Sequence, residues 1–312
     1  MYAIAEFGST SRSTSDKYSD RDLLVVCNKD KQSMLYERFS NKGFSVSVLN
    51  PEQLMYMKQR GSLFLQHLRA EAKILIDSDG RLARFLNSCE LVPPSVTELR
   101  KCKGTIKFIS SWSDSITLSA WKSDFLYCIS RDLLIKTLAT KGVVVFGLED
   151  LEREVGLHYG VSKEEFENLR ALRKIKAAYR SNNELPHEMV ENANAWLITL
   201  RHTFDAPLID ASMESLESKV KHLKDRQFNS AYERLRSLEA VYLIARSNNL
   251  RHPDHDLLMK HILSPNRYGS SQNRKTSQIN KYLCDVIDLL TTTPFQAKHF
   301  SLRFASLQMH TG

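Results

Sequence analysis

The strongest constraint on the fold of this chain is a change in hydrophobic periodicity at Pro93 and Pro94. Before this proline pair, short apolar runs are separated by turn-forming residues, and residues 44–50 alternate between apolar and polar side chains, as in a strand. After it, apolar residues recur at steps of three and four, and glycine and proline are sparse, as in helices. The sequence therefore predicts an α+β protein, with a mixed sheet at the N-terminus followed by a mostly α-helical C-terminal region.

Before the proline pair, four segments have the pattern of strands and three have the pattern of helices. The predicted strands are residues 2–7, 22–26, 44–50 and 73–77, and the predicted helices are residues 31–43, 51–60 and 62–72. Asn50 followed by Pro51 supplies an N-cap and a first-turn proline for the second helix. The first two strands are expected to be neighbours, because only a turn-rich stretch separates them.

From residue 95 onward the chain is expected to be helical. The candidate helices are residues 117–140, 147–155, 162–181, 187–203, 213–225, 228–247, 254–263 and 277–291. The helix at 162–181 has the clearest signals, with Ser162 as its N-cap, acids in its first turns and cations in its last. With a second break at residues 204–212, the sequence predicts three regions, which are residues 1–92, 93–206 and 207–312.

Composition narrows the compartment and the partners of the chain. It contains no long apolar run and no N-terminal signal segment, so we expect no membrane span and no membrane partner. The five cysteines are odd in number and scattered, which favours reduced thiols and a cytoplasmic location. The net charge of +8 favours polyanionic partners such as nucleotides or nucleic acids.

Residues 7–26, FGSTSRSTSDKYSDRDLLVV, join the first two predicted strands. The side-chain period of two places Asp20 and Asp22 on one face of the second strand. Two neighbouring carboxylates repel each other unless a cation lies between them, and a divalent metal is the simplest such cation. Gly8 allows close approach of a phosphate, and Ser9 offers a hydroxyl and a backbone N–H to it. The pattern predicts a site where Mg²⁺ is held against a triphosphate.

With this motif, the chain resembles the nucleotidyltransferases of the DNA-polymerase-beta superfamily, especially the minimal and aminoglycoside-type branches. Gly8-Ser9, Arg12 and Ser19-Asp20-Arg21-Asp22-Leu23 match the GS, arginine and SDxDL of that family in order and spacing. The resemblance covers residues 2–90 and extends loosely to about residue 181. It implies that Asp20 and Asp22 are catalytic and bind Mg²⁺. It also implies that the nucleotide is bound by Gly8, Ser9, Arg12 and Ser19.

The helix predicted at 162–181 carries a group of cations, which are Arg170, Arg173, Lys174, Lys176 and Arg180. Their ordinary role is to complement the helix macrodipole in solvent. The resemblance implies a second role, in which one or two of them reach the triphosphate from the helical domain that closes over the nucleotide. Arg173 and Lys176 are the candidates for this role.

Two departures from the family pattern leave the activity open. Ser13 stands where the family usually has glycine. The family also carries a third carboxylate on the third strand, on the face turned toward the other two, where this chain has Ser45 and Ser47. Because serine ligates metal weakly, a second metal ion would be poorly held. The chain is therefore expected to be either an active enzyme or a catalytically reduced member.

The leading functional hypothesis is transfer of a nucleoside monophosphate, AMP, from an NTP, ATP, to a hydroxyl group, with Mg²⁺. The acceptor is left open among RNA, protein and a small molecule. The alternative is a nucleotidyltransferase-like regulatory or antitoxin subunit that acts with a partner subunit in a toxin–antitoxin or phage-defence module. A third hypothesis is a synthase of cyclic or linear oligonucleotide signals, which would use the same acids.

Three further groups in the C-terminal region have both functional and ordinary explanations. Arg246 and His252 have the spacing of the arginine–histidine signature of helical ribonuclease toxins, but their sequence favours a helix end and a loop. Three histidines suggest a metal site, but no further ligand completes the set. The last group is a basic set that forms either a phosphate-binding patch or a solvated helix face. The three histidines are His252, His255 and His261. The basic set consists of Lys219, Lys221, His222, Lys224, Arg226 and residues 264–278.

Overall fold

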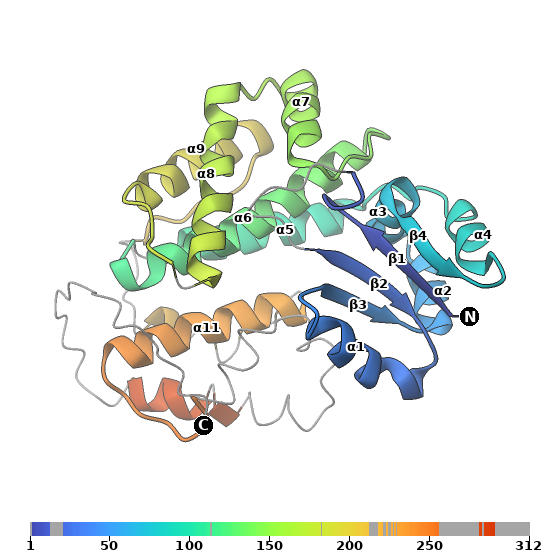
Figure 1. Cartoon of the computed structure of the whole chain (residues 1–312). Helices are drawn as coiled ribbons and strands as arrows, with labels where there is room; N and C mark the ends of the chain where they lie inside the picture. Colours follow the sequence, from blue (N-terminus) through green and yellow to red (C-terminus); the bar gives the residue numbers. More distant parts are fainter. Residues whose placement is uncertain are drawn as a thin grey trace. The chain divides into compact units, whose positions relative to one another are not determined.

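The computed structural model shows an α+β protein, as predicted, with a four-stranded mixed sheet at the N-terminus followed by helices (Figure 1). It describes residues 2–12, 21–112, 114–181, 183–211, 218–220, 223, 226, 228, 230–255, 281, 282 and 284–290.

The chain forms two compact units, and each consists of two separate stretches of sequence. The larger unit comprises Met1–Ile109 and Asp124–Leu208, and the smaller unit comprises Ser110–Ser123 and Ile209–Gly312. The predicted sheet region and most of the predicted helical domain therefore belong to the larger unit.

The sheet has the strand order β3-β2-β1-β4 and contains β1 (Ala3–Phe7), β2 (Asp22–Val26), β3 (Ser45–Leu49) and β4 (Lys73–Asp77). β1 pairs antiparallel with both β2 and β4, whereas β2 and β3 are parallel. The four predicted strands and the predicted pairing of the first two are confirmed. The β1–β4 register shifts at Leu75, which is an extra residue on β4.

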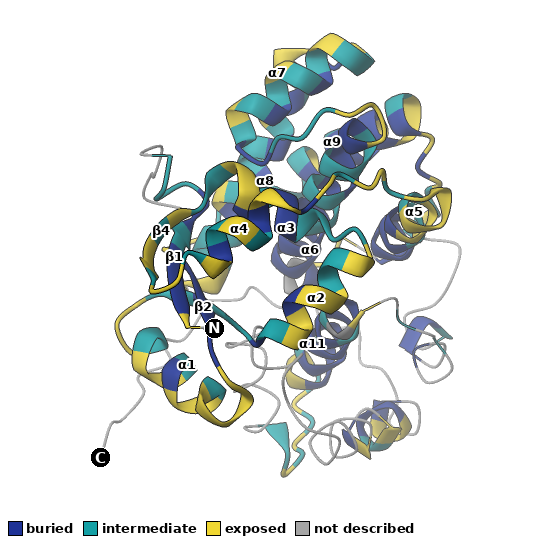
Figure 2. Cartoon of the chain, turned by 90° about the vertical axis from the view of Figure 1, so that its right-hand side faces the viewer, coloured by how far each residue is buried: buried dark blue, intermediate teal, exposed yellow. Residues whose placement is uncertain are grey.

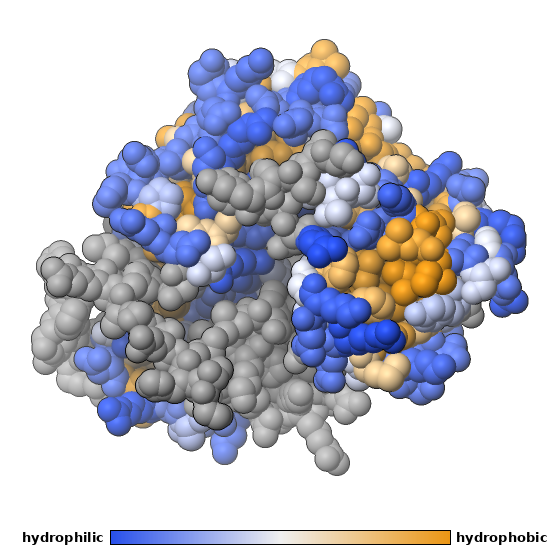
Figure 3. All heavy atoms as spheres, in the orientation of Figure 1, coloured by the Kyte–Doolittle hydropathy of each residue, from blue (hydrophilic) through white to orange (hydrophobic). Residues whose placement is uncertain are grey.

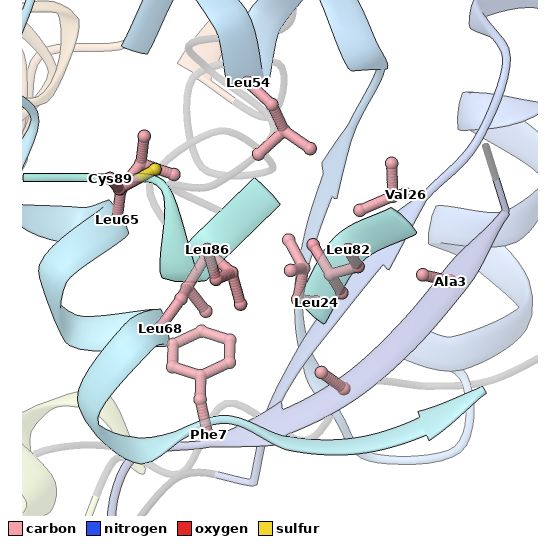
Figure 4. Close-up of a cluster of buried hydrophobic side chains, with 11 residues drawn as sticks. Ala3, Phe7, Leu24, Val26, Leu54, Leu65, Leu68, Leu82, Leu86 and Cys89 are labelled. Carbon is pink, nitrogen blue, oxygen red and sulfur yellow. The ribbon is translucent and has the colours of Figure 1, made fainter. Parts of the chain in front are cut away.

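One face of the sheet is covered by α2 (Pro51–Gln59), α3 (Leu63–Glu71) and α4 (Arg81–Asn87). Phe7, Leu24 and Leu68 lie in the apolar core on this side (Figure 4). Asn50 accepts a hydrogen bond from the backbone of Gln53, whose side chain bonds back to Asn50, so the predicted N-cap is confirmed. α4 is a helix that the sequence pattern did not predict.

The other face carries a smaller core under α1 (Gln32–Ser40). Leu23, Val25 and Val46 pack against Leu35 of this helix. A short 3-10 turn, η1 (Lys29–Lys31), precedes α1. The outer side of α1 is exposed (Figure 2). Among the described residues, α1 is the helix that covers β2 and β3 on this face.

The predicted helices of the second region are confirmed to within a few residues. They are α6 (Ile116–Ala139), α7 (Leu148–Tyr159), α8 (Lys163–Arg180) and α9 (Met189–Phe204), and they follow α5 (Val96–Ser110). Ser162 caps α8 through a capping box with Glu165, as its sequence predicts. Trp196 of α9 is fully buried and donates a hydrogen bond to Ser130 Oγ at 2.9 Å.

In the smaller unit, the best-defined element is α11 (Ala231–Ser247). Trp121 donates a hydrogen bond to the backbone carbonyl of Arg236 at 2.7 Å and contacts Trp112 edge to face. The helix predicted at 228–247 is confirmed, and the one predicted at 277–291 is helical at residues 281, 282 and 284–290. The segments predicted as helices at 213–225 and 254–263 lie mostly outside the described residues. Within the described ranges, no helix combines the length and the apolarity needed to cross a bilayer.

Candidate functional site

The candidate site begins at a tight turn where β1 ends. Gly8 is buried and has a φ of +75°, a backbone conformation that strains residues with a side chain. Its carbonyl accepts a hydrogen bond from Ser11 Oγ at 2.8 Å and a longer one from the Arg12 amide at 3.4 Å. Ser9 follows within the turn and is half-buried. Residues Gly8 to Arg12 are called the glycine turn below.

Asp22 lies directly against this turn. It is the first residue of β2 and pairs with Phe7, the residue before Gly8. A Cβ atom added to Gly8 would lie 2.8 Å from Asp22 Oδ2, so any side chain here would displace the Asp22 carboxylate. Asp22 shares its face with Leu24 and Val26, as predicted, because these two lie in the core of that face. The structure thus brings the glycine and one of the two predicted acids together. Asp20 and Ser19 lie outside the described residues.

β3 contributes serines to the same face. Ser45 pairs with Asp22, and Ser47 pairs with Leu24, so both serines share the Asp22 face of the sheet, as predicted. Where the structure describes the chain, no group of three or more His, Cys, Asp or Glu side chains could hold a metal ion. Mg²⁺ is commonly bound by one or two carboxylates together with substrate phosphates. The Asp22 carboxylate beside the backbone of Gly8 supplies one oxygen ligand group of that kind.

Arg12, at the end of the glycine turn, forms an ion pair with Glu71 at the end of α3. Glu71 also accepts a hydrogen bond from His67 Nε2 at 2.8 Å, and its side chain is only 10% exposed. Burial raises the pKa of Glu71, but the hydrogen bond from His67 and the charge of Arg12 outweigh it, so the pKa lies below its usual value. The carboxylate of Glu71 is thus held ionised against the predicted triphosphate-binding arginine.

His67 connects the sheet to the start of α7. Its ring stacks on Phe146 with centroids 4.3 Å apart and meets Phe7 edge to face at 5.4 Å. The carbonyl of Phe146 accepts a hydrogen bond from Arg131 at 2.7 Å. A Cβ added to the next residue, Gly147, would lie 3.5 Å from Arg12 Nη2. The glycine turn is therefore enclosed on one side by α3 and the residues that lead into α7.

Neither His67 nor Glu71 was among the residues predicted from the sequence. Their spacing of four residues on the helix predicted at 62–72 was the available signal, because residues i and i+4 face each other on a helix. The third partner, Arg12, lies 59 residues from Glu71 in the sequence. Helical periodicity carries no information about such a distant contact.

The cations of α8 make contacts with neighbouring helices. Arg170 pairs with Glu152 of α7, and Lys176 Nζ lies 5.3 Å from the centroid of the Tyr127 ring. Arg180 forms two hydrogen bonds of 2.9 Å with Asp124, whose side chain is fully buried. Arg173 is half-buried. A nucleotide-binding role for Arg173 and Lys176 remains a prediction.

The two described members of the predicted basic set, Lys219 and Arg226, make internal contacts. Lys219 is 6% exposed and donates to the carbonyl of Ala211 at 2.6 Å, and Arg226 pairs with Glu233 at 2.7 Å. The ring of His252 packs edge to face on Tyr282. His255 also packs on Tyr282. The other members of the basic set and of the histidine group lie outside the described residues; these are Lys221, His222, Lys224, His261 and residues 264–278.

Replacing Gly8 by alanine should destabilise the fold more than the same change at Gly43. Both glycines have positive φ, so each alanine variant should lose about 1–2 kcal/mol through backbone strain. A Cβ at Gly43 meets nothing within 4 Å, whereas a Cβ at Gly8 lies 2.8 Å from Asp22 Oδ2, so the carboxylate has to leave its rotamer at a further cost of about 0.5–1.5 kcal/mol. Chemical denaturation of both variants measures the difference. Equal losses would show that Asp22 is free to move away from the turn.

Replacing Glu71 by glutamine should lower the stability at neutral pH by about 1.5–3 kcal/mol, because hydrogen bonds to a charged group are lost. A carboxylate with a lowered pKa stabilises the fold fully above its unfolded pKa, near 4.5, and loses this effect as the pH falls through its folded pKa. The stability gap between the wild type and Glu71→Gln should therefore narrow below about pH 4.5 in denaturation series. Glu37→Gln, on the exposed side of α1, is the matched control and should change the stability by less than about 0.5 kcal/mol.

Comparison of the chain with known proteins identifies no relative. No model of a protein family, no curated protein and no solved structure matches it. A proposal about function therefore has to be based on the sequence motif and on the geometry of the site.

Proposed function

We propose that this chain is a metal-dependent nucleotidyltransferase similar to the DNA-polymerase-beta superfamily. It transfers a nucleoside monophosphate, AMP, from ATP to a hydroxyl group and releases pyrophosphate. The observation that carries the proposal is the close contact between the left-handed Gly8 and the carboxylate of Asp22. Glycine at this position lets the backbone of the turn and the Asp22 carboxylate lie side by side without displacing either.

The proposed roles follow from the chemistry of the residues. The backbone of Gly8 and the hydroxyl and N–H of Ser9 would bind the β- and γ-phosphates, since a turn of this kind presents N–H groups to an anion. Asp22, with Asp20, would hold Mg²⁺, which when bound neutralises charge on the phosphates. In phosphoryl chemistry of this type, positioning and charge neutralisation supply most of the catalysis. Ser19, Arg12, Arg173 and Lys176 are proposed as further contacts to the nucleotide.

The proposed acceptor is an RNA end, a protein side chain or a small molecule. The net charge of +8 favours RNA. All five cysteines are free thiols, which supports the proposed cytoplasmic location.

The test is to label total RNA and total protein of a cell lysate with each α-labelled NTP, using the intact chain and the Asp20→Ala/Asp22→Ala variant. Label that appears in one fraction with the intact chain alone identifies the acceptor class. Labelled products formed from NTP without any lysate would instead identify a synthase of oligonucleotide signals. If the variant labels as strongly as the intact chain, the assignment to these two acids is wrong.

A second candidate function is a catalytically reduced, regulatory or antitoxin subunit of a toxin–antitoxin or phage-defence module. Two observations favour it: Ser45 stands beside Asp22 where a third carboxylate would lie, and Arg12 is paired with Glu71. Metal-dependent NTP binding without pyrophosphate release, across RNA, protein and small-molecule acceptors, would support this function. Pyrophosphate release that depends on Asp22 would exclude it.

A further inference from the structure

The arginine proposed to contact the nucleotide is already paired within the protein. Arg12 ends the glycine turn, and its guanidinium forms an ion pair with Glu71, the last residue of α3. The two side chains are 24% and 10% exposed, so the pair is largely shielded from water. A guanidinium binds carboxylate and phosphate through the same fork of N–H groups. A carboxylate on Arg12 therefore occupies donors that a phosphate would use.

Glu71 does not depend on Arg12 alone. Its Oε2 also accepts a hydrogen bond from His67 Nε2 at 2.8 Å. The His67 ring is fixed in turn, because it stacks on Phe146 with centroids 4.3 Å apart and meets Phe7 edge to face at 5.4 Å. Glu71 thus keeps one partner when Arg12 turns away, which lowers the cost of releasing the arginine.

We propose that Glu71 regulates the nucleotide site by competing with the triphosphate for Arg12. This inference rests on the proposed function, since it takes Arg12 as a contact to the nucleotide. To bind Arg12, the triphosphate has to replace the carboxylate with its own oxygens. A ligand that needs a minor form of a protein binds more weakly in proportion to the population of that form. Glu71 therefore weakens nucleotide binding and sets the concentration below which Arg12 stays on α3.

The test is to measure the binding of inorganic triphosphate with Mg²⁺ by isothermal titration calorimetry, for the wild type and Glu71→Gln. Glutamine has nearly the shape of glutamate, and its amide oxygen can replace Oε2 as the acceptor from Arg12 and His67. Without the negative charge these hydrogen bonds are weaker, so Glu71→Gln should bind triphosphate about tenfold more tightly. Weaker binding would mean that Glu71 positions Arg12 for the phosphate, and unchanged binding would mean that the two do not compete. Either result overturns the proposal.

Two controls separate the release of Arg12 from the loss of a nearby negative charge. Asp150, in the first turn of α7, has its Oδ2 3.0 Å from the Cβ position of Gly147, and Arg12 Nη2 lies 3.5 Å from the same point. Asp150 pairs with Arg153 and is 41% exposed, and hydrophilic side chains cover much of the surface over α7 in this view (Figure 3). Because water screens its charge, Asp150→Asn should change the affinity by less than about threefold. In an Arg12→Gln background, Glu71→Gln should have an equally small effect.

A gain from Asp150→Asn as large as that from Glu71→Gln would overturn the proposal, since charge alone would explain both. A gain of about tenfold from Glu71→Gln in the Arg12→Gln background would overturn it for the same reason.

The variant Asp22→Asn keeps the failure of this proposal distinct from that of the proposed function. If Asp22→Asn weakens triphosphate binding while Glu71→Gln leaves it unchanged, the nucleotide site stands and only its regulation by Glu71 is overturned. If neither the wild type nor Glu71→Gln binds triphosphate at millimolar concentrations, both proposals are overturned.

A structure of the wild type gives a result that does not depend on any variant. Glu71→Gln is expected to be less stable than the wild type, so circular dichroism should first show that it is folded. The crystal structure of the wild type with Mg²⁺ and triphosphate shows the partner of Arg12 directly. Arg12 bound to phosphate oxygens in place of Glu71 supports the proposal, and Arg12 still paired with Glu71 overturns it.

Discussion

Replacing Asp22 by asparagine should reduce nucleotidyl transfer by at least about a hundredfold, the scale of losing a preorganised electrostatic group at a site of this kind. Asparagine has nearly the same shape as aspartate, so the contact with Gly8 can be kept while the negative charge is lost. The measurement is pyrophosphate release at saturating Mg²⁺ and NTP, together with the thermal midpoint of the variant. Activity should fall while the midpoint stays near that of the wild type.

Asp30→Asn is the matched control, because Asp30 is an exposed acid in η1, four residues after the end of β2. It should leave the rate of transfer unchanged. If Asp22→Asn and Asp30→Asn have equal rates, Asp22 binds no catalytic metal. If Asp22→Asn instead lowers the thermal midpoint strongly, Asp22 serves the fold of the turn, and the second candidate function is favoured.

Replacing Arg180 by methionine should destabilise the larger unit by about 3 kcal/mol. Arg180 makes two hydrogen bonds to Asp124, which is fully buried, so its loss leaves a buried carboxylate without its cation. Breaking one partner of a buried ion pair costs about 3–5 kcal/mol, and the lower end applies because Arg180 is 33% exposed. Chemical denaturation followed by far-UV circular dichroism measures the loss.

Two variants separate the effect of charge from that of packing. Lys174→Met removes an exposed cation of the same helix and should change the stability by less than about 0.5 kcal/mol. The double variant Asp124→Asn/Arg180→Met removes both charges, so it should be more stable than Arg180→Met alone. If Arg180→Met is as stable as Lys174→Met, other partners are sufficient to stabilise the buried carboxylate of Asp124.

Much of the fold could be predicted because local patterns decide it. β3 alternates between apolar and polar residues, and the other three strands are short, mainly apolar runs. Asn50 and Ser162 begin their helices with capping boxes, which local sequence encodes fully. α4 was missed because it has only seven residues, too few for a clear period, and because its N-cap, Gly80, ends the turn-forming run Ser78-Asp79-Gly80.

The site divides in the same way. The contact between Gly8 and Asp22 could be anticipated because it lies at the junction of two strands joined by one short segment, where the period of two fixes the faces. The pairing of Arg12 with Glu71 could not, because it depends on how α3 packs beside the turn. Arg180 has the same sequence signature as a solvated cation at a helix end. Its buried partner, Asp124 on α6, is brought next to it by helix packing, and no local sequence pattern predicts that packing.

The path of the backbone between the two compact units limits how this protein can be divided. The chain leaves the larger unit after Ile109 and returns to it at Asp124, within α6. A truncation after Leu208 would therefore keep Trp112 and Trp121 but remove Arg236, whose carbonyl binds the indole of Trp121. No single cut separates the two units. A fragment that ends at Leu208 keeps all of the larger unit, but it exposes Trp112 and Trp121, whose packing partners in the smaller unit it lacks.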